Sequence, residues 1–304
     1  MASDQKENEL LDIGDTDQRC LGVVLAGLPN AGKSSLFNIM VGEKLSIVTP
    51  KEQTTRDIIM GAMVDKTRQL VFIDSPGIFI PRKSRSLERK IVKNAWKGLL
   101  AADIACIVID STAAISENLR TTVRDITRKQ EKIIFTLNKV DLVKKGKLLT
   151  MAAELSTLWP KFLEIFMIST VTGENVNKLK EYLLAIAPKR PWLFAEDEIT
   201  NVSEKFIASE MTREKLFLSL RRDLPYSVDV VTDSWENFDN GSIRIRQTIR
   251  VLKDSQKSIV LGKAGSTLKN INIAARKDME SFFGTKIHLF IFVRSMDTWL
   301  DEKF

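Results

Sequence analysis

The chain has 304 residues, of which 44% are apolar and 28% are charged, and its net charge is +7. This composition is typical of an ordinary globular protein of about two domains. Its two cysteines, Cys20 and Cys106, argue against a disulfide scaffold and suit a reducing cytosol. The single histidine, His288, argues against histidine-based catalysis and a histidine-built metal site. No apolar run approaches the roughly 20 residues that a membrane-spanning helix needs.

Residues 1–19 are polar and acidic. They lack the apolar core of a signal peptide and the arginine-rich, acid-poor character of a transit peptide. We therefore predict a disordered tail on a cytoplasmic protein.

The most informative motif follows the apolar run Leu21–Ala26, which predicts a buried strand. It has the pattern G-x-x-x-x-G-K-S, and a helical pattern begins directly after it. Strand, loop and helix in this order are the context of a phosphate-binding loop, whereas a chance glycine-rich turn would lack it. Backbone N–H groups and the helix N-terminus would hold phosphates, the lysine would reach the β- and γ-phosphates, and the serine hydroxyl would ligate Mg²⁺. The predicted nucleotide contacts are Gly27, Leu28, Pro29, Asn30, Ala31, Gly32, Lys33, Ser34 and Ser35.

Short apolar runs then alternate with helical patterns, which predicts a parallel α/β sheet. The predicted strands are Ile58–Val64, Gln69–Ile73, Ile104–Ile109, Lys132–Leu137 and Leu163–Ile168. The predicted helices are Arg85–Leu100, Asn118–Arg128, Lys147–Leu158 and Val176–Ala185. Because ligands bind beyond the carboxyl ends of such strands, motifs at these ends are candidate site residues.

A D-x-x-G motif ends the strand Gln69–Ile73 and consists of Asp74, Ser75, Pro76 and Gly77. Its aspartate can hold Mg²⁺ through water, and its glycine N–H can meet a γ-phosphate. Thr55 lies in the polar loop before the preceding strand, where its hydroxyl can complete the metal shell. The predicted metal ligands are therefore Ser34, Thr55 and Asp74, and the predicted catalytic residues are Lys33, Thr55, Asp74 and Gly77.

A second polar motif follows the strand Lys132–Leu137 and consists of Asn138, Lys139, Val140 and Asp141. The Asp141 carboxylate can accept hydrogen bonds from guanine N1–H and the 2-amino group, whereas adenine would leave it unpaired. Ser169 and Thr170 end the last strand, where a backbone N–H could meet guanine O6. The four motifs in this order resemble the translation-factor-like class of GTPases.

Ile78 follows D-x-x-G, where many GTPases place a glutamine that orients water. An isoleucine cannot orient water by hydrogen bonding. The resemblance to GTPases with a hydrophobic residue here suggests that Asn30 helps to hold a potassium ion. Packing beside the nucleotide loops is the alternative role of Ile78.

After a linker, residues 188–200, a helical pattern at Ser203–Leu220 is followed by strand patterns at Tyr226–Thr232, Ser242–Leu252 and Ile287–Val293. Between the last two strands a G-x-x-G loop connects an apolar segment to a helix. Residues 241–295 hold eleven basic and three acidic residues, a local net charge of +8 that suggests a polyanion partner. This loop and order of elements are those of a KH module that clamps four nucleotides. The predicted RNA contacts are Gly262, Lys263, Ala264, Gly265, Lys269, Arg276 and Lys277, whereas Phe282 and Phe283 are expected in the core.

The predicted fold is an α/β P-loop GTPase domain followed by an α+β type II KH domain. The expected divisions are the tail at 1–19, the GTPase domain at 20–187, the linker at 188–200, the KH domain at 201–295 and a C-terminal tail at 296–304.

From about Gly22 to Arg294 the chain resembles the Era family of bacterial ribosome-associated GTPases. The resemblance is strongest at Gly27–Ser34, Gln53–Arg56, Asn138–Asp141, Leu224–Val228 and Ala275–Glu280. It implies GTP hydrolysis to GDP, coupled to binding of the 3′ end of small-subunit ribosomal RNA and to assembly of the 30S subunit. Because water attacks the γ-phosphate without a side-chain base, we expect unassisted turnover to be slow. The resemblance also implies that the protein can associate peripherally with the inner membrane. We expect the protein to be a monomer.

Departures from the family pattern are mild: Ala31 replaces the usual valine, Ser75 the usual threonine and Thr170 the usual alanine. Three other functions stay open: a non-enzymatic, nucleotide-gated RNA-binding protein, a tRNA-modification or protein-targeting GTPase, and an ATPase. The intact phosphate and metal ligands disfavour the first, the G-x-x-G module the second, and Asp141 the third.

Overall fold

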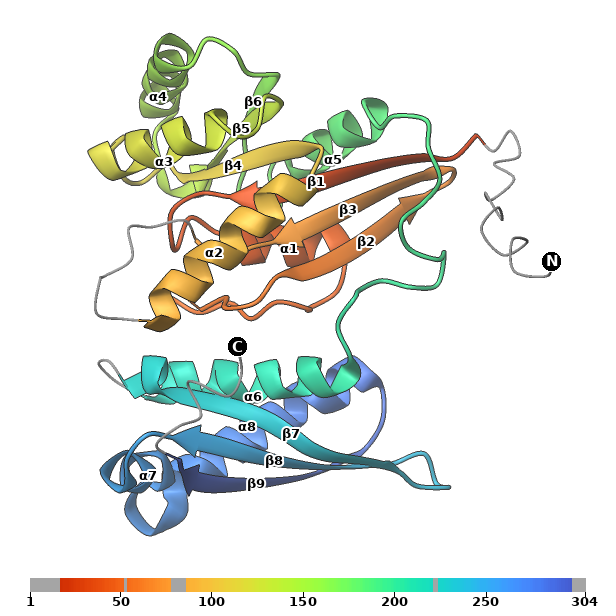
Figure 1. The fold of residues 1–304 in the computed structure, drawn as a ribbon, viewed down its shortest axis with the longest axis vertical. Coiled ribbons are helices and arrows are strands. Elements are labelled where there is room, and N and C mark those ends of the chain that lie inside the picture. Colours follow the sequence, from red (N-terminus) through yellow and green to blue (C-terminus); the bar gives the residue numbers. More distant parts are fainter. Residues whose placement is uncertain (1–16, 52–53, 78–85, 221–223, 297–304) are drawn as a thin grey trace, which may run out of the picture.

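The computed structural model describes residues 17–51, 54–77, 86–220 and 224–296, which form two α/β units stacked on each other (Figure 1). The larger unit contains a six-stranded sheet and the smaller one a three-stranded sheet. No helix in these four segments combines the length and apolar character needed to cross a bilayer. The predicted tails lie outside the described residues except for 17–19 and 296.

The large sheet has the strand order β2-β3-β1-β4-β5-β6. Its strands are β1 (Arg19–Ala26), β2 (Ile59–Asp65), β3 (Arg68–Asp74), β4 (Ile104–Asp110), β5 (Ile133–Asn138) and β6 (Glu164–Met167). All neighbouring pairs are parallel except β2 and β3. The expectation of a parallel sheet was thus wrong for β2, because only Lys66 and Thr67 join it to β3. Two residues can turn a hairpin but cannot make a parallel crossover.

Helices cover both faces of this sheet: α1 (Lys33–Val41), α2 (Ser86–Ala101), α3 (Glu117–Thr127), α4 (Lys145–Leu158) and α5 (Val176–Ala185) (Figure 1). Because side chains alternate along a strand, β1 contributes to both cores. Leu21, Val23 and Leu25 pack with α1 and α5, whereas Val24 and Ala26 pack with α2, α3 and α4. The predicted elements are confirmed to within two residues at their ends.

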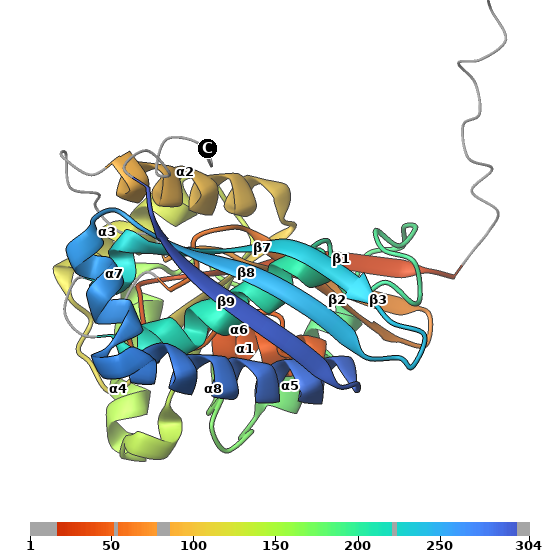
Figure 2. The ribbon, with the colours of Figure 1, turned by 90° about the horizontal axis from the view of Figure 1, so that it is seen from below.

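The small unit contains α6 (Glu204–Ser219), β7 (Val228–Asn237), β8 (Ile243–Val251), α7 (Asp254–Leu261), α8 (Ser266–Phe283) and β9 (Ile287–Ser295). Its β7 and β8 are antiparallel, and β8 and β9 are parallel. Helices α6 and α8 cover one face of the sheet (Figure 2). The predicted order of elements is confirmed, but α7 was not predicted. Its first five residues are polar or charged and its last three are apolar, so no helical period is visible in the sequence.

Strand β7 extends five residues beyond the predicted end at Thr232. A bulge between Thr232 and Ser234 shifts its register against β8, which interrupts the apolar alternation that marks a strand.

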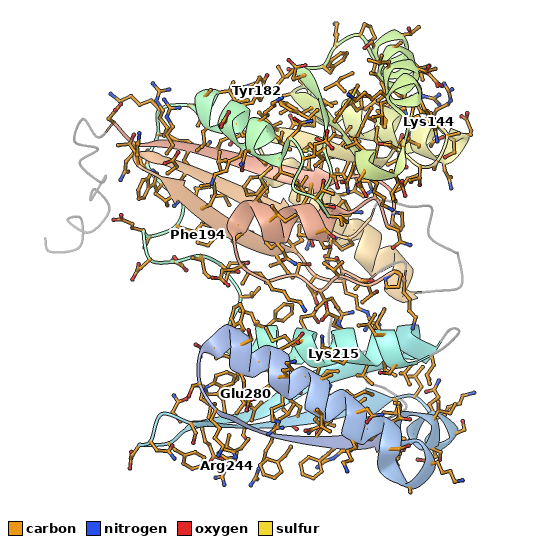
Figure 3. The ribbon with its side chains drawn as sticks, turned by 180° about the vertical axis from the view of Figure 1, so that it is seen from behind. Lys144, Tyr182, Phe194, Lys215, Arg244 and Glu280 are labelled. Carbon is orange, nitrogen blue, oxygen red and sulfur yellow. The ribbon has the colours of Figure 1, made fainter. Side chains whose placement is uncertain are left out.

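The segment 188–200 was predicted as a linker, and the structure places it along the edge of the large sheet. Ile199 O accepts from Ala62 N (2.9 Å), and the Thr200 hydroxyl donates to Met60 O (2.7 Å). The Phe194 side chain is buried in a small core beside Cys20, Ala62 and Val71 (Figure 3). The linker therefore covers part of the sheet edge. At the other predicted boundary, β1 begins at Arg19, one residue before the expected start of the domain.

Candidate functional site

A cavity of about 520 Å³ opens at the carboxyl ends of the parallel strands. Most of the predicted nucleotide residues line it: Pro29, Asn30, Gly32, Lys33, Ser34, Ser35, Thr55, Gly77, Asn138, Lys139, Asp141 and Thr170. Others lie in the same loops without lining the cavity: Gly27, Leu28, Ala31, Asp74, Ser75, Pro76, Val140 and Ser169. Ile78 is outside the described residues. The four motifs therefore converge on one site, as the strand-end rule requires.

The phosphate-binding loop is shaped by a close approach between Gly32 and Asn138. Gly32 has φ +97°, and a Cβ there would lie 2.1 Å from Asn138 Nδ2, so only glycine fits. The Lys33 ammonium donates to Leu28 O (2.8 Å) across the loop. Burial lowers the pKa of Lys33 to about 8, although the Asp74 carboxylate opposes this shift. A bound polyphosphate would supply the negative charge that this buried cation lacks.

Asp74, Ser34 and Thr55 form the predicted metal site. The two hydroxyls lie together, with Ser34 Oγ and Thr55 Oγ1 3.0 Å apart. The Asp74 carboxylate is fully buried, and its Oδ2 accepts from Ser46 Oγ (2.6 Å). Its Oδ1 is buried without a hydrogen-bond partner in the described chain. Burial raises the pKa of Asp74, against the effects of the neighbouring hydroxyls and Lys33.

This oxygen-rich donor set fits Mg²⁺. A buried carboxylate oxygen without a donor is costly, and a metal-bound water would satisfy it. Ser46 was missed by sequence reasoning, because a serine in a loop 28 residues from Asp74 carries no pattern.

Asn138 ties the two ends of the cavity together. Its Nδ2 donates to Ala31 O (2.9 Å) in the phosphate loop, and its Oδ1 accepts from Thr170 N (3.1 Å). The Thr170 hydroxyl also lies 3.3 Å from Asn138 Nδ2, so the unusual hydroxyl joins the network. The backbone N–H of Ser169 donates to Glu174 O. A backbone N–H of Ser169 or Thr170 was expected to meet guanine O6, and in this structure the N–H of each residue already has an acceptor.

Asp141 is exposed at the cavity rim. Lys139 has φ +66°, and its ammonium pairs with Asp110 Oδ2 (2.6 Å). This contact contributes to a lowered pKa of Asp110, although burial alone would raise it. Sequence reasoning missed Asp110, yet it ends β4 in the same way as Asp74 ends β3. A polar residue at the carboxyl end of a buried strand was the available signal.

The loop between α1 and β2, residues 42–58, carries Thr55 and is called the Thr55 loop below; its residues 52 and 53 are not described. Asn30 Nδ2 donates to Pro50 O in this loop (3.3 Å). Asn30 has φ +61°, a left-handed backbone conformation. The predicted potassium-binding side chain thus contacts one backbone carbonyl of the Thr55 loop, that of Pro50.

The G-x-x-G loop connects α7 to α8. Gly262 has φ +74°, and a Cβ there would lie 2.1 Å from the Thr267 hydroxyl. Lys263 and Ala264 are exposed at its tip. The other predicted RNA contacts are Gly265 of the loop, which is half-buried, and Lys269, Arg276 and Lys277, which are exposed on α8. Phe282 and Phe283 pack against the core, as expected.

Helix α6 of the small unit contacts the Thr55 loop directly. Arg213 Nη1 donates to Thr54 O (2.7 Å), and Glu214 Oε1 accepts from Val48 N (3.1 Å). Glu214 Oε2 also pairs with Lys44 (2.7 Å). The Lys51 ammonium donates to the Phe217 and Leu220 carbonyls at the C-terminal end of α6.

The comparisons with known proteins agree with this geometry. Residues 22–139 match the 50S ribosome-binding GTPase family, and residues 223–300 match the KH domain family. GTPase Era of Bradyrhizobium sp. (strain BTAi1) is 41% identical over 94% of this chain and 92% of its own length. GTPase Era of Rickettsia conorii is 43% identical over 93% of this chain and 83% of its own length.

Two crystal structures are similar over 93% of this chain and 95% of theirs. Era in complex with MgGDPNP and nucleotides 1506–1542 of 16S ribosomal RNA has a TM-score of 0.88 at 31% identity. A single-residue variant of Aquifex aeolicus Era bound to GDP·AlF4⁻ has a TM-score of 0.87 at 30% identity.

Proposed function

Because the chain belongs to the Era family of GTPases, we propose that it is a GTP-hydrolysing switch that binds the 3′ end of small-subunit ribosomal RNA and assists 30S assembly. The observation that carries the proposal is the direct bonding of the Thr55 loop to α6. This loop supplies a predicted metal ligand of the nucleotide site, and α6 belongs to the KH domain. A change at the γ-phosphate thereby reaches the RNA-binding domain through hydrogen bonds.

In hydrolysis, the backbone N–H groups of residues 30–35 and the Lys33 ammonium stabilise negative charge on the transferring phosphoryl group. We expect the Gly77 N–H to meet the γ-phosphate; Gly77 lines the cavity, and a Cβ there would be 3.0 Å from Pro29 N. Asp141 selects guanine at the rim. Since no general base is assigned to the attacking water, unassisted turnover is expected to be slow.

Ser34 and Thr55 would hold Mg²⁺ directly, and Asp74 would hold it through water. The ion, when bound, neutralises charge on the β- and γ-phosphate oxygens. Thr55 can ligate Mg²⁺ only if its loop stays closed over Ser34. The contacts between α6 and the Thr55 loop should therefore also stabilise the metal site.

A potassium ion beside Asn30 is part of the proposal. The Asn30 amide nitrogen donates to the Pro50 carbonyl, and both residues line the cavity, so a carbonyl oxygen lies beside the amide near the phosphate loop. Rotation of the amide would turn its oxygen toward a monovalent cation. Such a cation would supply the positive charge that Ile78 cannot.

The remaining parts of the proposal are a cytoplasmic location, which the cysteine usage suits, and a monomeric state. Peripheral association with the inner membrane follows from the family resemblance. Flotation with anionic lipid vesicles and sedimentation analysis test the membrane association and the monomeric state.

The experiment that tests the function measures binding of a labelled RNA with the 3′-end sequence of 16S ribosomal RNA, in the presence of a GTP analogue. We expect this RNA to bind more tightly than a shuffled RNA of equal length. The variant Ala264→Asp, which adds a negative charge at the tip of the G-x-x-G loop, should weaken binding of both. Equal affinity for the native and shuffled RNA would contradict recognition of the 3′ end.

A further inference from the structure

The KH sheet has an open face. Its buried side chains, among them Ile245, Ile249 and Leu289, point toward α6 and α8. No helix in the described part of the chain covers the opposite face, which lies nearest the viewer in Figure 2. Side chains alternate along β8 and β9, so the even-numbered residues belong to this open face.

Two phenylalanines lie on the open face of β9. Phe290 and Phe292 are 47% and 49% exposed, although phenylalanine is normally buried. They are two residues apart on one strand, which separates their Cα atoms by about 6.6 Å. Nearby, the Phe238 ring lies edge-on to His288, with centroids 6.4 Å apart, and the Arg244 guanidinium stands 5.2 Å from its centre. Aromatic rings thus line much of the face.

Arginines lie beside these rings. In the register of β8 and β9, Arg246 is opposite Phe290, and Arg250 is opposite Arg294. None of these three arginines forms an ion pair with another residue that the structure describes. The acidic groups on this face are engaged: Glu236 pairs with Arg244, which Figure 3 labels, Asp233 accepts from Thr248 Oγ1 (2.6 Å), and Asp229 is buried.

The arginine end of this face adjoins the start of α7, the helix that leads into the G-x-x-G loop. Ser295, the last residue of β9, donates to Asp254 Oδ1 (2.6 Å) at the start of α7. Helix α7 runs from there into Gly262. A strand of RNA that leaves the loop can therefore pass the end of β9 and reach the open face.

We propose that the open face of β8 and β9 is a second binding site for single-stranded RNA. Bases stack on Phe290 and Phe292, and phosphates lie near Arg246, Arg250 and Arg294. Exposed rings interleaved with unpaired arginines suit a chain of bases and phosphates, whereas a purely apolar protein partner would leave the arginines desolvated and unpaired. The inference rests on the proposed RNA-binding function and extends it to nucleotides flanking the four at the G-x-x-G loop.

The test compares an RNA of 4 nucleotides with an RNA of 12 nucleotides. The first is about as long as one KH groove, and the second is about three times as long. The full-length double variant Phe290→Ala, Phe292→Ala should bind the short RNA normally and the long RNA at least about fivefold more weakly for each ring removed. Because both rings are half exposed, their loss should leave the fold intact. The matched variant Phe290→Tyr, Phe292→Tyr keeps the rings and should bind the long RNA like the unmodified protein.

A variant with leucine at both positions keeps apolar area but loses the rings, and it should behave like the alanine variant. Normal binding of the long RNA by the alanine variant overturns the inference, even if association with a ribosomal protein is lost. The Ala264→Asp variant separates the two proposals. If it leaves both RNAs unaffected, the proposed RNA function fails; if it weakens both while the alanine variant weakens neither, only the second site fails.

Discussion

Replacing Glu214 by glutamine should uncouple the two domains without unfolding either. The Glu214 side chain is 5% exposed and accepts hydrogen bonds from Lys44 (2.7 Å), Lys215 (3.0 Å) and Val48 N (3.1 Å). These donors outweigh the effect of burial and lower the pKa of Glu214, so the carboxylate stays charged at neutral pH. Glutamine has nearly the same shape and keeps one acceptor for Val48.

The cost follows from these contacts. Glutamine loses two charge-assisted hydrogen bonds, each worth about 1.5–3 kcal/mol when buried. The bond from Lys215, which is 15% exposed, is taken at the lower end, about 1.5 kcal/mol. Lys44 is 40% exposed, so water largely replaces its bond, which is worth about 0.5 kcal/mol. The total loss is therefore about 2 kcal/mol. That corresponds to roughly a 30-fold change in an equilibrium constant.

The assay is the ratio of RNA affinities in the GTP-analogue and GDP states, measured by fluorescence anisotropy. We expect this ratio to move toward one in Glu214→Gln. The variant should still bind the nucleotide without RNA, and RNA without the nucleotide. Lys178→Gln, which neutralises an exposed lysine on α5, should leave the ratio unchanged. A ratio in Glu214→Gln within about twofold of the unmodified protein would refute the role of this contact.

Three further predictions concern the nucleotide site. The affinity for GTP should fall as pH rises above 8, by at most about tenfold per pH unit. The reason is that the pKa of Lys33 is lowered to about 8, so the free protein loses this ammonium above that pH. An affinity for GTP that does not change as pH is raised through this pKa would contradict this. Asp141→Asn should shift preference from GTP toward xanthosine triphosphate by about 1–3 kcal/mol, as competition binding can measure; unchanged preference would reopen the ATPase alternative. Asn30→Ala should abolish any stimulation of turnover by potassium over sodium, and equal turnover of the unmodified protein in both salts would remove the potassium site.

Much of the nucleotide site could be predicted from the sequence because its chemistry follows buried strands. Asp74 and Asn138 end β3 and β5, so a short apolar run was enough to place each one at the same sheet edge. Asp110 obeys the same rule and could have been identified with it. The antiparallel direction of β2 could also have been inferred, since Lys66 and Thr67 leave no room for a crossover.

The contacts between domains could not be predicted in this way. Arg213 and Glu214 are charged residues on an amphipathic helix, where a solvated position is the usual expectation. They are only 2% and 4% exposed because the Thr55 loop covers them. That burial depends on how two separately patterned domains pack, and no local period records it. The exposure of Phe290 and Phe292 could not be predicted for a related reason. These residues alternate with core residues in one continuous apolar run, so the sequence does not show which of them face away from the core.

The most direct test of nucleotide-switched RNA binding is a closed thermodynamic cycle on the full chain. RNA affinity is measured with GDP and with a GTP analogue, and the analogue's affinity relative to GDP is measured with and without RNA. Linkage requires both ratios to be equal, and a coupling of about 1–3 kcal/mol gives a factor of roughly 5 to 150. We expect equal ratios in this range. Ratios of one in both directions would show two tethered modules rather than a switch.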